Sequence, residues 1–142
     1  MHPPTLLLVE DNPDDAELVR IAIADAKLDA DLEVVVDGAQ ALAYVRAEGA
    51  YAGKRRPDLV LLDLNLPGID GREVLHQIKT DPDLCSIPVV VMSTSVDDED
   101  VRVSFREHAN AFVSKAPDFD QLVETFEAIN DFWLKVSRLP TR

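Results

Sequence analysis

Cysteine is nearly absent from the 142-residue chain, and its scarcity limits how the fold can be held together. The single cysteine, Cys85, has no partner for an intramolecular disulfide, and no histidine lies near it to complete a zinc site. A chain of this length can bury about two-thirds of the surface that its unfolded form exposes, so one hydrophobic core is sufficient to stabilise it. The cysteine content is consistent with a reducing compartment.

Positive charge is also scarce. Lysine and arginine contribute 14 residues against 27 aspartates and glutamates, which gives a net charge of −13 and a pI near 4.4. A protein with this negative field repels a polyphosphate backbone, so direct binding to DNA or RNA is excluded as a function. We expect most of the acidic side chains to form a solvated surface.

Long hydrophobic runs are missing. The longest, residues 59–62 and 87–92, are far shorter than the roughly 20 residues that span a bilayer, so no membrane partner is expected. Residues 1–4 lack the basic region and apolar stretch of a secretion signal, which predicts a cytoplasmic protein. The sequence contains no internal repeat and no low-complexity segment, and we interpret residues 1–142 as one domain.

Five apolar segments alternate with helical patterns along the chain. The segments are residues 5–9, 32–36, 59–62, 89–92 and 111–114. Three of them are apolar on successive residues, as expected for strands of a parallel sheet that is covered on both faces. Glu33 interrupts the second segment, which predicts that this strand lies nearer a sheet edge.

Helix start signals follow the apolar segments. Asn12 is a capping residue with Pro13 at the first helical position, and apolar side chains then recur at the spacing of one helix face: Val19, Ala22, Ile23 and Ala26. The other four helices begin with short capping side chains: Asp37, Asp70 with Glu73 three residues later, Ser95 with Asp98, and Asp118. Strand and helix thus alternate five times, which predicts a doubly wound α/β fold with helices on both faces.

Polar residues end four of the predicted strands: Glu10 and Asp11, Asp63, Ser93, and Lys115. Function in an open α/β sheet sits at the carboxyl ends of the strands, so these side chains form a candidate site. Neighbouring carboxylates repel each other unless a cation compensates, and oxygen-only ligands suit Mg²⁺. Alternatively, Glu10 and Asp11 only cap the following helix. Asp63 fits that alternative poorly, because it ends a central strand where desolvation is costly.

These residues resemble the receiver domain of bacterial two-component response regulators over nearly the whole chain. The resemblance rests on the acidic pair Glu10-Asp11, the segment DLNLPGIDG at residues 63–71, Ser93 after the fourth strand, and Lys115 after the fifth. It implies a flavodoxin-like fold with a five-stranded parallel sheet in the order 2-1-3-4-5. The first and third strands are neighbours in that fold, so the acids would meet.

The resemblance implies that Asp63 accepts a phosphoryl group from a histidine of a sensor kinase. The protein would then be no enzyme beyond its own phosphorylation and dephosphorylation. Mg²⁺ would be held by Glu10, Asp11, Asp63 and the backbone carbonyl of Asn65, while Lys115 would add a second positive charge. Glu10 is one methylene longer than the aspartate of many receivers, so we expect it to contact the ion through water.

The family's switch implies roles for two further residues. After phosphorylation, Ser93 would hydrogen-bond a phosphoryl oxygen and draw in the following loop, coupled to an aromatic residue of the fifth strand, here Phe112. Both residues also have simpler interpretations, since Ser93 could cap a turn and Phe112 could be an ordinary core residue.

Two further positions depart from the family's pattern. Thr94 stands after the switch hydroxyl, where a small residue is common, and would narrow access to Asp63. The family lysine is usually followed at once by a cis proline, whereas Ala116 separates Lys115 from Pro117 here. A cis bond before alanine would cost about 2.5–4 kcal/mol.

The last predicted helix, at about residues 118–137, would be roughly 30 Å long at 1.5 Å per residue, more than a five-stranded sheet requires. Its apolar residues recur at helical spacing: Leu122, Phe126, Ile129, Trp133 and Val136. We assign the first three to the core. Phe132 and Trp133 lie beyond the part that covers the sheet, so a protein interface is favoured over a core position for this pair.

The segments 132–134 (FWL) and 8–15 (LVEDNPDD) are similar to single-domain regulators that partner phytochrome-type sensor histidine kinases and commonly form homodimers. We therefore expect a symmetric dimer through the last helix. We also expect no output domain, so that the signal leaves through protein contacts.

Two other functions fit parts of the pattern. A Mg²⁺-dependent phosphohydrolase of the haloacid dehalogenase type would use Asp63 as nucleophile, but it needs an aspartate two residues later as general acid, and that position is Asn65. A phosphorylation-independent binding module is disfavoured by the presence of all five site residues.

Overall fold

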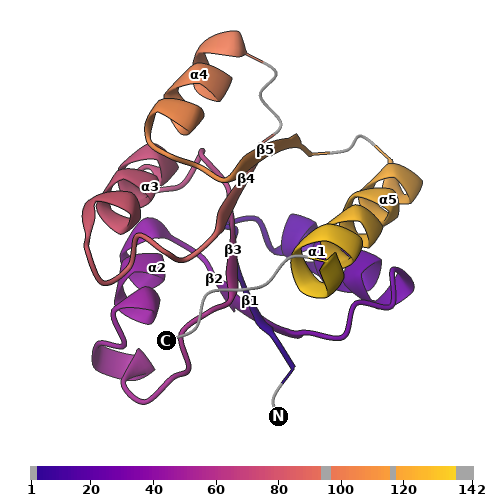
Figure 1. Cartoon of the computed structure of the whole chain (residues 1–142), viewed down its shortest axis with the longest axis horizontal. Helices are drawn as coiled ribbons and strands as arrows, with labels where there is room; N and C mark the ends of the chain where they lie inside the picture. The colour runs from indigo at the N-terminus through magenta and orange to yellow at the C-terminus, as the bar shows by residue number, and fades with distance from the viewer. Residues whose placement is uncertain (1–2, 94–96, 116–117, 137–142) are drawn as a thin grey trace.

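The computed structural model describes residues 3–93, 97–115 and 118–136, with side chains up to residue 133. Its centre is a parallel sheet of five strands in the order β2-β1-β3-β4-β5 (Figure 1). The strands are β1 Thr5–Val9, β2 Asp31–Val35, β3 Leu59–Leu62, β4 Val89–Ser93 and β5 Ala111–Ser114. The predicted doubly wound, flavodoxin-like fold and its strand order are therefore confirmed, with β2 beginning and ending one residue earlier than the pattern predicts.

Helices cover both faces of the sheet (Figure 1). The helices are α1 Pro13–Asp25, α2 Gly38–Val45, α3 Gly71–Thr80, α4 Asp98–Arg106 and α5 Phe119–Ile129, with a short 3-10 turn at Gly49–Tyr51. Helices α1 and α5 pack on one face, while α2 and α3 pack on the other, and α4 lies on the side of α3. The sheet therefore has a separate hydrophobic cluster on each side.

The central strands are buried on both faces, as the unbroken apolar runs predict. In β1, Leu7 and Val9 pack into the cluster under α2 and α3, whereas Leu6 and Leu8 pack under α1 and α5. All residues of β1, β3 and β4 are buried, while most of edge strand β2 is half-buried or exposed. This buried centre fixes the positions of the residues that end β1 and β3.

The helix starts agree with the capping signals in four of five cases. The Asn12 side chain accepts hydrogen bonds from the backbone N–H groups of Asp14 and Asp15, and the Asp37, Asp70 and Asp118 side chains also cap their helices. The predicted start of α4 at Ser95 is wrong: Asp97 is the N-cap and accepts from Glu99 N–H. Asp97 is one of four consecutive acids, and the capping-box spacing alone did not distinguish among them.

The last helix changes its winding. An α-helix covers Phe119–Ile129, and residues Asn130–Val136 continue as a π-helix, so the prediction of one α-helix over residues 118–137 is only partly right. A π-helix has more residues per turn, and the rise of 1.5 Å per residue overestimates the length of that part. In this segment Asn130 is buried and Phe132 lies on the surface.

Within the described ranges, the helices lack the combination of length and apolar character needed to cross a bilayer.

Candidate metal centre

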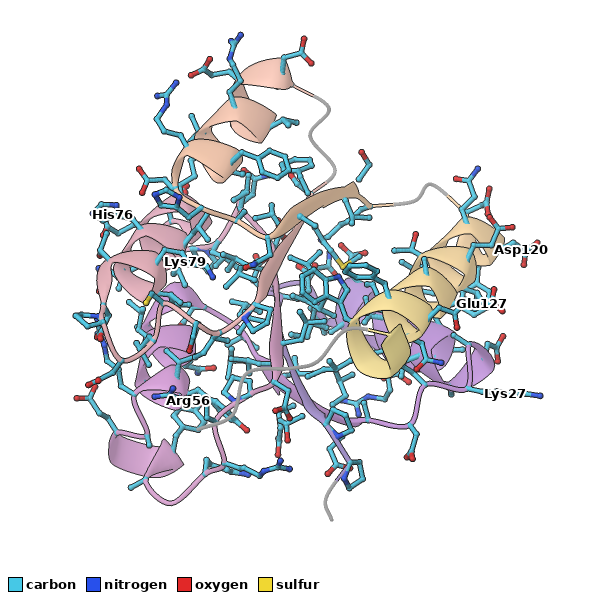
Figure 2. All side chains as sticks on the ribbon, viewed as in Figure 1. Lys27, Arg56, His76, Lys79, Asp120 and Glu127 are labelled. Carbon is cyan, nitrogen blue, oxygen red and sulfur yellow. The ribbon has the colours of Figure 1, made fainter. Side chains whose placement is uncertain are left out.

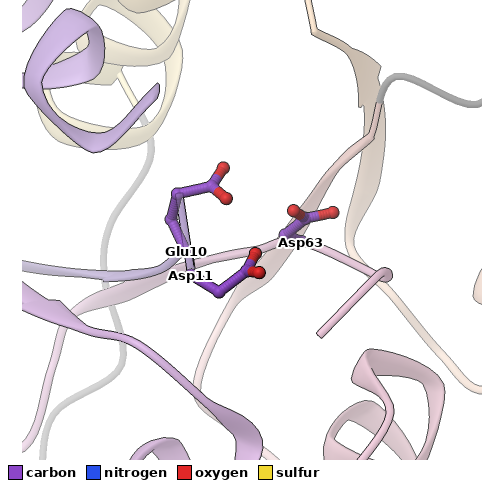
Figure 3. A group of neighbouring side chains, drawn as sticks. All are labelled: Glu10, Asp11 and Asp63. Carbon is purple, nitrogen blue, oxygen red and sulfur yellow. The ribbon is translucent and has the colours of Figure 1, made fainter. Parts of the chain in front are cut away.

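Three carboxylates meet at the carboxyl edge of the sheet. Glu10 and Asp11 follow β1, Asp63 follows the neighbouring strand β3, and one carboxylate oxygen from each lies within 4.8 Å of the others (Figure 3). Val9 pairs with Leu62, and Asp63 N–H donates to the Val9 carbonyl at 3.2 Å, so the next residues of the two strands lie side by side. The predicted acid trio is therefore brought together by the sheet itself.

Two of the three acids are buried. Glu10 is 2% exposed and Asp63 is 7% exposed, whereas Asp11 faces solvent. Burial, the largest influence, raises the pKa of the Glu10 carboxyl, although hydrogen bonds to Lys115 and to Asn12 N–H act in the opposite direction. A buried carboxylate pair needs compensating positive charge, so this site favours a cation.

Lys115 supplies one such charge. It follows β5, where its N–H donates to the Ser93 carbonyl at 2.8 Å, and its ammonium donates to Glu10 and, at 3.2 Å, to Asp63 Oδ2. Burial lowers the pKa of the ammonium, but the bonds to Glu10 and Asp63 outweigh it, and the net direction is upward. Lys115 therefore stays protonated beside the acids.

Backbone donors orient two of the carboxylates. Asn65 N–H donates to Asp63 Oδ1 at 3.1 Å, and Asn12 N–H donates to Glu10 Oε2 at 3.2 Å. The side chain of Asn65 is exposed, and the role predicted for its carbonyl oxygen stays a prediction. These bonds restrain the acids and leave their other oxygens for Lys115 or a metal ion.

Gly71 allows the Asp63 loop to pack against α3. A Cβ atom at this position would lie 2.3 Å from the Asp63 carbonyl oxygen and 2.6 Å from Leu64 Cα. Its N–H donates to the Leu64 carbonyl at 3.0 Å. The sequence carries no signal for this contact beyond the glycine itself, because the close approach of the two backbones depends on how α3 packs.

The predicted switch residues lie in neighbouring strands. Ser93 is fully buried at the end of β4 and pairs with Ser114 of β5. Phe112 of β5 is half-buried and packs against the cluster under α2 and α3, which accords with a core position as well as with a switch role. Thr94 and the bonds around Ala116 and Pro117 lie outside the described residues.

Phe132 and Trp133, the two residues predicted to lie at a protein interface, differ in their surroundings. Phe132 is 55% exposed, whereas Trp133 packs partly against the cluster under α1 and α5, and the two rings meet edge to face at 5.2 Å. Together with Val113 and Ile129 they help to line a shallow groove of about 350 Å³. One aromatic of the pair is thus available to a partner.

The structure adds Asp15, which sequence reasoning did not single out. Its Oδ2 lies 3.6 Å from the Lys115 ammonium. The only signal for it in the sequence is its position in the helix turn that directly follows the acidic pair.

The donor set fits a hard divalent cation. All side-chain donors of the trio are carboxylate oxygens, two are buried, and together they carry more negative charge than Lys115 balances. Glu10, Asp11 and Asp63 can therefore hold a divalent metal ion.

Comparisons with known proteins identify response regulators as relatives, one of them with a divalent metal ion bound. The family described as "Response regulator receiver domain" matches residues 6–127. The response regulator Rcp1 of Synechocystis sp. is 42% identical over 138 residues, which cover 97% of this chain and 94% of Rcp1. A crystal structure of the Mn²⁺-bound form of Rcp1 has a TM-score of 0.90 and covers 98% of this chain and 100% of the other.

Two further solved structures are similar. The phosphorylated cyanobacterial phytochrome response regulator RcpA is 45% identical with a TM-score of 0.92, over 99% of this chain and 100% of RcpA. The response regulator RPA3017 in red light signalling of R. palustris is 32% identical with a TM-score of 0.93, over 98% of this chain and 99% of that chain. With the acid trio and lysine at the carboxyl edge of the sheet, these matches show that the chain belongs to the response regulator receiver family of two-component signalling proteins.

Proposed function

We propose that this receiver accepts a phosphoryl group on Asp63 from a sensor histidine kinase. The carrying observation is that the Asp63 carboxylate lies within 4.8 Å of Glu10 and Asp11 and 3.2 Å from the Lys115 ammonium. A carboxylate in this position can act as a nucleophile while neighbouring charges compensate the phosphoryl oxygens.

In the transfer step, an Asp63 oxygen attacks the phosphorus of a phosphohistidine. An O–P bond forms as the N–P bond breaks, the imidazole nitrogen leaves with the electron pair, and the product is an acyl phosphate. Asn65 N–H restrains the carboxylate orientation, and the Lys115 ammonium offsets the negative charge of the phosphoryl group. Beyond this transfer, the protein would catalyse only the hydrolysis of its own acyl phosphate, in which water attacks, the Asp63 carboxylate is regenerated and inorganic phosphate is released.

We assign Mg²⁺ to the acid trio. Glu10, Asp11, Asp63 and the Asn65 backbone carbonyl would hold it, with Glu10 acting through water. When bound, Mg²⁺ supplies positive charge that reduces repulsion between the carboxylates and the incoming phosphoryl oxygens. The Mn²⁺-bound form of Rcp1 supports a divalent ion in a relative of this protein.

The signal would pass through Ser93 and Phe112. Ser93 lies at the end of β4, next to β5, and its hydroxyl would donate a hydrogen bond to a phosphoryl oxygen. This hydrogen bond would change how the end of β4 meets β5, and Phe112 and the surface formed by α4, β5 and α5 would change with it. Phe112 contributes only its ring, since phenylalanine has no hydroxyl.

The partner and the assembly belong to the same proposal. RcpA is a phytochrome response regulator, which supports a phytochrome-type kinase as the donor for this chain. We propose a cytoplasmic homodimer that uses the last helix, with Phe132 and Trp133 at the interface. Trp133→Ala and, separately, Phe132→Ala should then shift sedimentation from dimer to monomer, and a dimer that persists in both variants would remove these residues from the interface.

The phosphohydrolase alternative gains no support. Asn65 stands where the general acid would be needed, and Rcp1, RcpA and RPA3017 are all named as response regulators.

Acetyl phosphate with Mg²⁺, followed by intact-mass measurement, tests the acceptor. We expect one phosphoryl adduct that is absent with EDTA and absent in Asp63→Asn. Release of inorganic phosphate over many turnovers would instead favour a hydrolase, and an adduct that survives in Asp63→Asn would overturn the assignment of the acceptor.

A further inference from the structure

The Lys115 ammonium lies near three carboxylates, two from the acid trio and one from α1. Glu10 and Asp63 accept hydrogen bonds from it, and Asp15 Oδ2 lies 3.6 Å away as an ion-pair partner. The first two belong to the acid trio that can hold a metal ion, whereas Asp15 belongs to α1 and lies outside the trio. Asp15 is therefore a carboxylate partner of Lys115 that a metal ion in the acid trio would not use as a ligand.

A divalent cation and the Lys115 ammonium compete for the same two acids. Each is attracted to Glu10 and Asp63, and the two cations repel each other at short range. When the trio takes up a metal ion, the ammonium loses part of its hydrogen bonding and must move away from the ion. Because Lys115 is only 15% exposed in its side chain, that loss is not simply compensated by water.

Asp15 is well placed to receive the ammonium. Its backbone N–H donates to Asn12 Oδ1 at 3.1 Å, so the helix cap fixes its position on the first turn of α1. The lysine stem has four rotatable bonds, and closing 3.6 Å to hydrogen-bond distance needs no movement of the backbone. Among the ion pairs of the described residues, Lys115 pairs with Asp15 and not with its neighbour Asp14.

We propose that Asp15 is a positioning residue that takes the Lys115 ammonium when a divalent cation occupies the acid trio. It reduces the competition between lysine and metal, and it keeps the ammonium beside Asp63 for the incoming phosphoryl group. Only the placement of the ammonium for the phosphoryl group rests on the proposed function. The reduced competition between lysine and metal concerns metal binding by the unphosphorylated protein.

The test is Mn²⁺ binding by the unphosphorylated full chain, measured from the electron paramagnetic resonance signal of free Mn²⁺. Asp15→Asn should raise the Kd about 3–5-fold more than Asp14→Asn, which removes the same charge from the same helix turn. Asp15→Glu keeps the carboxylate and should restore affinity to within about 2-fold of wild type. Thermal unfolding of each variant checks that the fold is retained.

The decisive comparison repeats Asp15→Asn in a Lys115→Met background. If Asp15 acts through the lysine, its effect on the Kd should fall to that of Asp14→Asn once Lys115 is removed. An effect of the same size in both backgrounds would overturn the proposal, as would equal Kd values for Asp15→Asn and Asp14→Asn in wild type. The Mn²⁺ titration contains no phosphoryl donor. Its result can therefore be interpreted even if Asp63 does not accept a phosphoryl group.

Discussion

Helices α3 and α4 lie on the same side of the sheet but are held there differently. Helix α3 buries Val74, Leu75 and Ile78 completely, whereas Ser104 alone is buried within the described helix Asp98–Arg106 of α4. Phe105, a large apolar residue of α4, is 50% exposed. The hydrophobic effect therefore fixes α3 far more firmly than α4.

Polar contacts join α4 to α3 instead. Arg72 of α3 pairs with Asp100 at 2.5 Å, and His76 of α3 pairs with Glu107, just after α4, at 2.6 Å (Figure 2, where His76 is labelled). Partly exposed ion pairs contribute little compared with buried aliphatic side chains. Helix α4 can therefore change position at lower cost than α3, which supports the proposed path from Ser93 to the α4 surface.

The largest expected effect is on the core of α3. Ile78→Ala removes a fully buried side chain and should lower the free energy of unfolding by about 2–5 kcal/mol, measured by urea denaturation. The corresponding change on α4, Phe105→Ala, should lower it by only about 1 kcal/mol, because half of that residue already contacts water. Equal losses for the two variants would contradict the comparison.

A second change tests how α3 supports the acid site. Gly71→Ala would bring a Cβ to 2.3 Å from the Asp63 carbonyl, so the loop or the helix must shift. We expect a loss of about 1–3 kcal/mol in unfolding free energy and weaker Mn²⁺ binding. Unchanged stability together with unchanged Mn²⁺ affinity would show that the close contact does not restrain the site.

A third change weakens the polar link between the helices, together with the pair that Arg72 makes with Asp70 at the start of α3 at 3.1 Å. Arg72→Gln removes the pair with Asp100 and should cost less than about 1 kcal/mol globally, yet amide hydrogen exchange in α4 should become faster than in α3. Arg102→Gln is the matched control, because its partner Glu99 lies in the same helix at 2.6 Å. If both variants accelerate hydrogen exchange in α4 equally, the Arg72–Asp100 pair does not stabilise the position of α4.

Much of this arrangement could be predicted from the sequence. The acids and Lys115 follow apolar strands, and the topology of a parallel sheet brings strand ends together whatever the details of packing. Contacts that depend on how the helices pack were not predictable. Asp15 and Lys115 lie 100 positions apart, and the close approach at Gly71 depends on how α3 packs against the Asp63 loop.

The smallest expected effect is the pH dependence of the α3 to α4 link. The hydrogen bond to Glu107, more than its charge or that of Glu73, raises the pKa of His76 above its ordinary value of 6.5. A raised pKa in the folded state means that the protonated pair stabilises the fold fully below pH 6.5 and that this contribution is lost as the pH rises through the higher value. The difference in urea midpoint between wild type and His76→Gln should therefore shrink across that range. A difference that stays constant with pH would show that His76 joins the helices as a neutral hydrogen-bonding group, and its imidazole NMR titration would then lie at the ordinary value.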